Sequence, residues 1–211
     1  MRALIWDLGG TLVDTYPDVD RALAEAVRAQ PDEPLRREVA MLTRRSSSEA
    51  IAVLASRHDL PEAHLRAAYE ATKRHWAEHP PPLMDGAEEL MEAARDAGAL
   101  NLVATHRDRD SASALLDGLG LAVDDMVCAP DGYPRKPAPD MVRALLARHR
   151  LAPGECLAVG DRPADVEAAE AAGVDGVLLE TPGIPLEAPG ARRIHSLRAL
   201  IPEFRRGGAG D

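Results

Sequence analysis

The fold is decided by the stretch Ala3-Leu4-Ile5-Trp6-Asp7-Leu8-Gly9-Gly10-Thr11-Leu12. Its apolar run, residues 3–6, predicts a short buried strand. The strand leads directly into a carboxylate, Asp7, and then into two glycines and a threonine. In α/β proteins, ligands bind where parallel strands end, and glycine allows the backbone to approach a ligand closely. The stretch therefore predicts a chemical site at the end of the first strand.

The composition is that of an ordinary soluble globular protein of 211 residues. A net charge of -10, with no basic block, is not the pattern of a nucleic-acid-binding protein, and 3% aromatic residues are too few for base stacking. No apolar run approaches the ~18 residues of a membrane span. The N-terminal segment also lacks a signal-peptide pattern, so we expect a cytoplasmic protein with no nucleic-acid or membrane partner. Cys128 and Cys156 are expected to be free thiols.

Short apolar segments alternate with helical patterns through most of the chain, which is typical of parallel βαβ units. The predicted strands are residues 3–7, 100–105, 126–129, 156–160 and 175–179. The predicted helices that follow residue 82 are 86–97, 111–119, 139–149 and 163–172. The strands are apolar on both faces, as parallel strands covered by helices should be. We therefore predict an α/β fold: a Rossmann-like parallel sheet with helices on both faces.

Residues 15–82 interrupt this alternation, because they contain no convincing strand. Four helices are predicted there, over 19–30, 34–43, 48–58 and 61–79, and Ser46, Ser47 and Ser48 offer N-caps for the third. Three prolines at 80–82 mark a boundary. We interpret 15–82 as a helical cap domain inserted into a core of 1–14 and 83–211. The alternative is that these helices only enlarge the core. The Gly-rich residues 206–211 are expected to fray.

Four short motifs carry the candidate chemistry, and each lies at the C-terminal end of a predicted strand or in the loop after it. They are Asp7 with Gly10 and Thr11; Thr105, followed by His106; Lys136 within Arg135-Lys136-Pro137-Ala138-Pro139; and Asp161 with Asp165 in Val159-Gly160-Asp161-Arg162-Pro163-Ala164-Asp165. Only two of the 25 basic residues are lysines, so a lysine at position 136 favours a function over a chance surface position. The other lysine, Lys73, lies among charged residues and is typical of a solvated helix face.

In this order, the motifs resemble those of the haloacid dehalogenase superfamily, in its phosphoglycolate-phosphatase-like branch with a helical cap. The resemblance covers residues 3–179. It implies that Asp7 attacks phosphorus and forms an aspartyl-phosphate, and that Thr105 and Lys136 assist. It assigns phosphate binding to Leu8, Gly10, Thr11, Thr105, His106 and Lys136, and a Mg²⁺ site to Asp7, the Gly9 carbonyl, Asp161 and Asp165. His106 is equally consistent with a solvent-exposed loop residue.

Gly9 departs from the phosphatase pattern Asp-x-Asp, whose second aspartate is the general acid and base. Such a group typically contributes ~10²–10⁴-fold to the rate. Our first interpretation is a magnesium-dependent phosphatase of a small phosphorylated metabolite, acting as a monomer or homodimer. Its proton then comes from His106, from a cap histidine or from water, or its substrate has a good leaving group. The cap histidines are His58, His64, His75 and His79.

Two alternatives remain open. One is a phosphonate-cleaving or dehalogenase-type hydrolase, since those relatives also lack the second aspartate. Phosphonate-cleaving members need a cap lysine, and Lys73 is the only lysine within 15–82. The other is a slow or non-catalytic relative that binds a phosphorylated metabolite. Asp7, Lys136 and Asp161 argue against it, because stability alone does not require a buried cluster of charges.

Overall fold

The computed structural model describes residues 1–205, so the fraying expected for 206–211 lies outside the described residues. The chain divides into two compact units: Met1–Val13 with Leu83–Asp211, and Asp14–Pro82. The first unit holds every strand of the sheet, and the second is helical. No helix within residues 1–205 is both long enough and apolar enough to cross a membrane.

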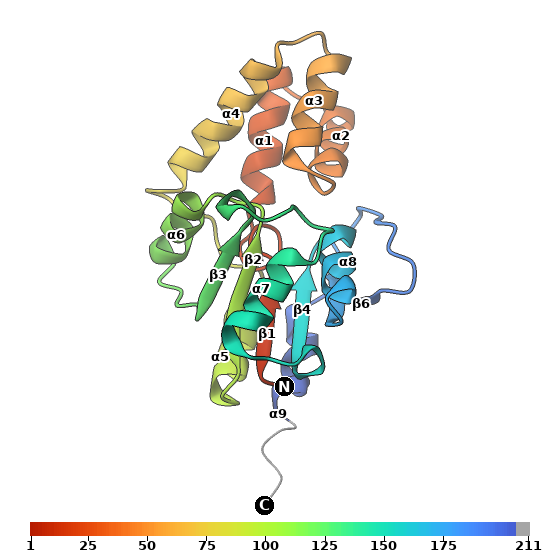
Figure 1. Cartoon of the computed structure of the whole chain (residues 1–211). Coiled ribbons are helices and arrows are strands. Elements are labelled where there is room, and N and C mark those ends of the chain that lie inside the picture. Colours follow the sequence, from red (N-terminus) through yellow and green to blue (C-terminus); the bar gives the residue numbers. More distant parts are fainter. Residues whose placement is uncertain (206–211) are drawn as a thin grey trace, which may run out of the picture. The chain divides into compact units, whose positions relative to one another are not determined.

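The first unit is built on a six-stranded parallel sheet (Figure 1). Its strands are β1 (Ala3–Trp6), β2 (Leu100–Thr105), β3 (Asp125–Cys128), β4 (Cys156–Gly160), β5 (Asp175–Leu179) and β6 (Arg192–Ile194). They run in the order β3-β2-β1-β4-β5-β6, with β1 between β2 and β4. The five predicted strands are confirmed. The sequence did not reveal β6, because it has three residues and two of them are arginines.

One face of the sheet packs against a helix that follows β3. Ile5 lies in register with Leu102 of β2 and Ala158 of β4, so the three side chains share a face. They join a buried cluster with Met141 and Leu145 of α7 (Asp140–His149). Parallel strands need such cover, because both of their faces are apolar.

The opposite face is covered by α5 (Ala87–Asp96). The indole Nε1 of Trp6 donates to Asn101 Oδ1 at 3.0 Å, and Asn101 Nδ2 donates to the carbonyl of Met91 in α5 at 3.1 Å. Both polar side chains are thus satisfied within the core, as burial requires. The remaining helices of this unit are α6 (Arg109–Gly118), α8 (Pro163–Ala171), α9 (Ile201–Arg205) and the 3₁₀ turns η1 (Ala129–Asp131), η2 (Pro153–Glu155) and η3 (Leu197–Leu200). The predicted fold class is confirmed.

The second unit consists of four helices: α1 (Tyr16–Val27), α2 (Glu33–Thr43), α3 (Ser47–Arg57) and α4 (Glu62–His75). Ser46 caps α3 by accepting the Glu49 amide at 3.4 Å, as expected for a capping serine. Inside the unit, Arg44 pairs with Asp20 at 2.5 Å and stacks over the Tyr16 ring, 3.7 Å from its centroid. These contacts place the charge of a buried arginine beside a carboxylate and an aromatic face.

Candidate active site

The loop after β1 is a tight turn that positions Asp7. The amides of Leu12 and Val13 both donate to the Leu8 carbonyl, at 3.0 and 2.9 Å, and the Gly10 amide donates to the Val13 carbonyl at 2.8 Å. Gly10 has a φ of 97°, a conformation that favours glycine. The second glycine of the stretch is therefore required by the backbone.

The turn also decides which amides of the loop form hydrogen bonds within the chain. The resemblance assigns phosphate binding to Gly10, and the Gly10 amide donates to the Val13 carbonyl inside the turn. The Leu8 and Gly9 amides have no backbone acceptor within residues 1–205. Unlike Gly10, Gly9 lies outside the positive-φ region, so its φ does not by itself require glycine.

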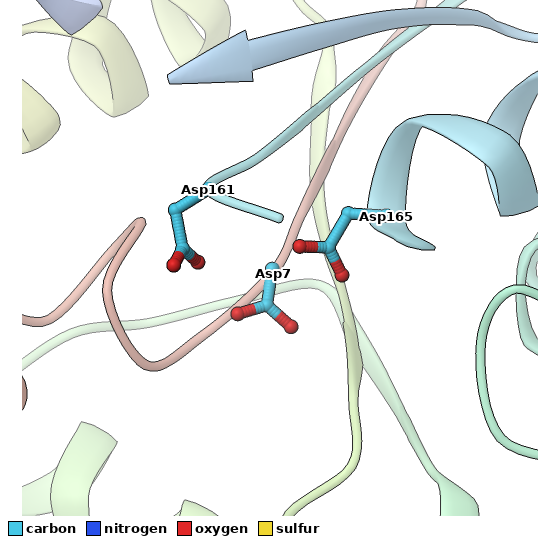
Figure 2. A group of neighbouring side chains, drawn as sticks. All are labelled: Asp7, Asp161 and Asp165. Carbon is cyan, nitrogen blue, oxygen red and sulfur yellow. The ribbon is translucent and has the colours of Figure 1, made fainter. Parts of the chain in front are cut away.

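Three carboxylates meet at the end of the sheet. Asp7 follows β1, Asp161 follows β4, and Asp165 lies in the first turn of α8. Each offers an oxygen within 4.8 Å of the others, and all three side chains are buried. Figure 2 shows them side by side, each carried by a different segment. Such a cluster repels itself unless cations stand beside it.

Lys136 is the principal cation of the cluster. Its Nζ donates to Asp7 Oδ1 at 2.6 Å and to Asp165 Oδ1 at 2.7 Å. Burial alone would lower the pKa of Lys136, but the carboxylates of Asp165 and Asp7 outweigh it and hold this pKa above its ordinary value. Burial likewise opposes ionisation of Asp165, yet Lys136 and Arg162 keep its pKa below the usual range. The ammonium is therefore charged and fixed between two carboxyl groups.

Asp161 and Asp165 are held by their own local contacts. Thr11 Oγ1 donates to Asp161 Oδ1 at 3.0 Å, and Asp165 Oδ2 accepts the Arg162 amide at 3.0 Å. A Cβ on Gly160 would lie 2.2 Å from the Asp165 Cβ. Only glycine at position 160 thus lets α8 begin so close to β4.

Thr105 lies buried at the end of β2. Its Oγ1 accepts the Arg107 amide at 3.2 Å, so the hydroxyl hydrogen can be donated elsewhere. A donor at a strand end beside β1 suits an anion, as the motif suggests.

His106 is fixed in a role that its sequence position did not reveal. Its Nε2 accepts the backbone amide of Lys136 at 2.7 Å, which ties this loop to the lysine. Burial, followed by the charges of Lys136, Arg162 and Arg135, lowers the pKa of His106 to about 3. The imidazole is therefore neutral at pH 7, and its Nε2 carries no proton. These properties argue against His106 as the general acid that would replace the aspartate absent at position 9.

The histidines of the helical unit have other partners. His64 Nε2 lies 3.0 Å from the Ala26 carbonyl, and His58 lies 3.8 Å from Glu38. The rings of His75 and His79 stack with their centroids 4.6 Å apart. None of these contacts singles out one histidine as a proton donor.

Arg162 is the site residue that sequence reasoning missed. Its Nη2 lies 3.7 Å from Asp7 Oδ2, and its Nε lies 3.8 Å from Asp165 Oδ2. The side chain is only 16% exposed. Arginine is common in this chain, so an arginine directly after Asp161 did not indicate a role in the site.

The donor set fits a hard divalent cation. Asp7 Oδ2 is buried and has no hydrogen-bond partner among the described residues. Magnesium prefers oxygen ligands, whereas zinc prefers nitrogen and sulfur. Both oxygens of Asp165 already accept hydrogen bonds, from Lys136 and from the Arg162 amide. Asp7 is therefore better placed than Asp165 as a direct ligand.

Comparisons with known proteins all point to one protein family. A family model of haloacid dehalogenase-like hydrolases matches residues 1–173. A phosphoglycolate phosphatase of Rhodospirillum rubrum is 33% identical over 193 residues, covering 84% of this chain and 79% of that protein. Among solved structures, a CbbY mutant from Rhodobacter sphaeroides with xylulose-1,5-bisphosphate is 27% identical, with a TM-score of 0.73 over 95% of this chain and 96% of its own. A Deinococcus radiodurans hydrolase with bound phosphate and sodium has a TM-score of 0.79 at 23% identity, over 99% of this chain and 96% of its own, and shares the fold.

Proposed function

Because this chain belongs to the haloacid dehalogenase-like hydrolases and is a phosphatase, we propose that it hydrolyses a small phosphorylated metabolite through an aspartyl-phosphate on Asp7. One observation carries the proposal. A buried lysine bridges Asp7 and Asp165, while the second oxygen of Asp7 has no hydrogen-bond partner among the described residues. Burying such a cluster brings little net stability, so a chemical use explains it best.

The proposed reaction has two steps. An oxygen of Asp7 attacks phosphorus, the bond from phosphorus to the leaving oxygen breaks, and Asp7 carries the phosphoryl group. Water then attacks the same phosphorus, which releases inorganic phosphate and regenerates Asp7. Lys136 holds Asp7 in place and offsets negative charge, and Thr105 together with the Leu8 and Gly9 amides donates to phosphoryl oxygens.

We also propose that Mg²⁺ belongs to this site. Asp7, Asp161 and the Gly9 carbonyl would hold it, with Asp165 acting through water or by orienting Lys136. When bound, the ion supplies positive charge that stabilises the transferring phosphoryl group.

Because Gly9 has no side chain, the loop offers no general acid at this position to protonate the leaving oxygen. With His106 neutral and tied to Lys136, we propose that water protonates the leaving oxygen, or that the substrate expels a stable anion. Acyl and glycosyl phosphates have better leaving groups than alkyl esters. The rate would then depend mainly on how stable the leaving group is as an anion.

The alternative chemistries have less support. Lys136, Asp161 and Asp165 form one cluster, as a metal-dependent phosphatase requires. Lys73, which a phosphonate-cleaving enzyme would need for a Schiff base, pairs with Glu70 at 2.9 Å on α4. We therefore retain the phosphatase proposal.

A screen of phosphorylated metabolites with Mg²⁺ tests the proposed function. The panel should include phosphoglycolate, because a relative is named a phosphoglycolate phosphatase, and sugar bisphosphates, because a similar structure contains xylulose-1,5-bisphosphate. Acyl and glycosyl phosphates complete the panel. We expect turnover, strongest with good leaving groups. A screen without turnover, carried out with a folded protein, would favour a protein that only binds such a metabolite.

We also propose that the protein acts in the cytoplasm.

Removal of divalent metal is expected to lower turnover by about three orders of magnitude or more, since metal charge is worth several kcal/mol to such transition states. The measurement is phosphate release after EDTA treatment and again after excess Mg²⁺. Added Mg²⁺ should also raise the melting temperature, because it binds the folded state alone. EDTA presaturated with Mg²⁺ is the control. Full activity in EDTA, with no Mg²⁺-dependent melting shift, would contradict a metal site.

Replacing Gly9 by aspartate is expected to raise turnover of alkyl phosphates by up to about 10²–10⁴-fold, since it restores a general acid. The backbone at Gly9 accepts an L-residue. Gly9→Asn is the matched control, because its amide has similar size but carries no transferable acid proton. Equal rates for the aspartate variant, the asparagine variant and the original protein, all folded, would mean that the proton comes from elsewhere.

A further inference from the structure

We propose that Arg162 is a further anion-binding residue of this site, which holds phosphoryl oxygens beside Asp7 together with Lys136. The inference rests on the proposed phosphatase function for the identity of the anion. Neither the four motifs nor their spacing assigns a role to this arginine.

The position of Arg162 is fixed by the backbone. It directly follows Asp161, and its amide donates to Asp165 Oδ2 at 3.0 Å, at the N-terminus of α8. From there the long side chain turns inward, to 16% exposure, and reaches both Asp7 and Asp165. The guanidinium is thus drawn inward toward two carboxylates, and this pairing offsets the cost of partly burying its charge.

Its distances differ from those of the lysine. Lys136 Nζ lies 2.6 and 2.7 Å from its two carboxylate oxygens, which is hydrogen-bond contact. The guanidinium of Arg162 stands 3.7 and 3.8 Å from its two, which is ion-pair distance. Arginine usually meets a carboxylate through two close parallel hydrogen bonds. The guanidinium thus lies beside Asp7 Oδ2, where an anion that approaches Asp7 would meet it.

The charge of the three carboxylates explains why a second cation lies beside Lys136. Asp7, Asp161 and Asp165 contribute three negative charges, against the positive charges of Lys136 and Arg162. A phosphate group that approaches Asp7 adds further negative charge, and the neutral His106 offsets none of it. The planar fork of a guanidinium matches two phosphate oxygens at once, which a lysine ammonium does not.

The test measures binding of inorganic phosphate, the proposed product, by isothermal titration calorimetry at fixed Mg²⁺ concentration. We expect Arg162→Gln to raise the dissociation constant of phosphate by about 10- to 100-fold, the usual worth of a hydrogen bond to a charged group. Arg162→Lys keeps the charge but loses the fork, so we expect a smaller loss. Arg95→Gln is the matched control, because Arg95 is exposed on α5 and is not one of the residues of the candidate site.

Two results would overturn the inference. One is a phosphate affinity in Arg162→Gln within about twofold of the original protein. The other is unchanged phosphate affinity with tighter Mg²⁺ binding, which would make Arg162 a counter-charge to the metal ligands. If Arg162→Gln fails to fold, Arg162→Lys decides, because an unchanged dissociation constant in that variant also contradicts a role for the fork.

The outcome is separable from that of the proposed function. Arg162-dependent phosphate binding in a protein that hydrolyses no phosphate ester would support the inference and remove the enzymatic proposal. Turnover by the original protein, with phosphate affinity unaffected in Arg162→Gln, would do the reverse.

Discussion

Replacing Asp7 by asparagine is expected to lower turnover by at least about four orders of magnitude, because an amide cannot form the aspartyl-phosphate. The substitution keeps the size of the side chain and leaves Lys136 paired with Asp165. The fold should therefore survive. The measurement is steady-state phosphate release, combined with mass spectrometry of acid-quenched protein to detect a phosphoryl group on Asp7.

Asp117→Asn is the matched control for this prediction, because Asp117 is an exposed aspartate on α6 of the same unit. It should retain full activity. Substantial turnover in the Asp7 variant, with mass spectrometry showing that asparagine is still present, would remove Asp7 as the nucleophile. A phosphorylated residue other than Asp7 would have the same consequence.

Replacing Lys136 by methionine is expected to abolish measurable turnover and to destabilise the protein by about 3–5 kcal/mol, the usual cost of removing one partner from a buried ion pair. Asp7 and Asp165 would both lose their ammonium donor while remaining buried. The two readouts are urea unfolding for stability and phosphate release for activity.

The chain offers its own control, because Lys73 is the other lysine and lies on α4. Lys73→Met removes a partly exposed pair with Glu70, so we expect at most about 1 kcal/mol of destabilisation and normal turnover. Equal effects of the two substitutions on activity would show that Lys136 has no special role. Activity is to be measured well below the unfolding midpoint, so that lost turnover does not reflect lost fold.

The sequence predicted the fold because the relevant patterns are local. Apolar runs such as Ala3–Trp6 form strands wherever helices cover them, and parallel strands end at one edge of a sheet. Asp7 and Asp161 each follow a strand directly, so their meeting was predictable once the sheet was. β6 escaped prediction, because two arginines in a three-residue strand carry no apolar pattern.

The sequence by itself thus determined five of the six strands, the helical segment, and which carboxylates and lysine are candidates for the site. Only the tertiary structure decided that the Gly10 amide closes a turn, that His106 accepts the Lys136 amide, and that Arg162 faces Asp7. These contacts join side chains and amides that lie in different loops. They depend on the direction in which each side chain leaves its backbone, and no spacing along the chain encodes that direction.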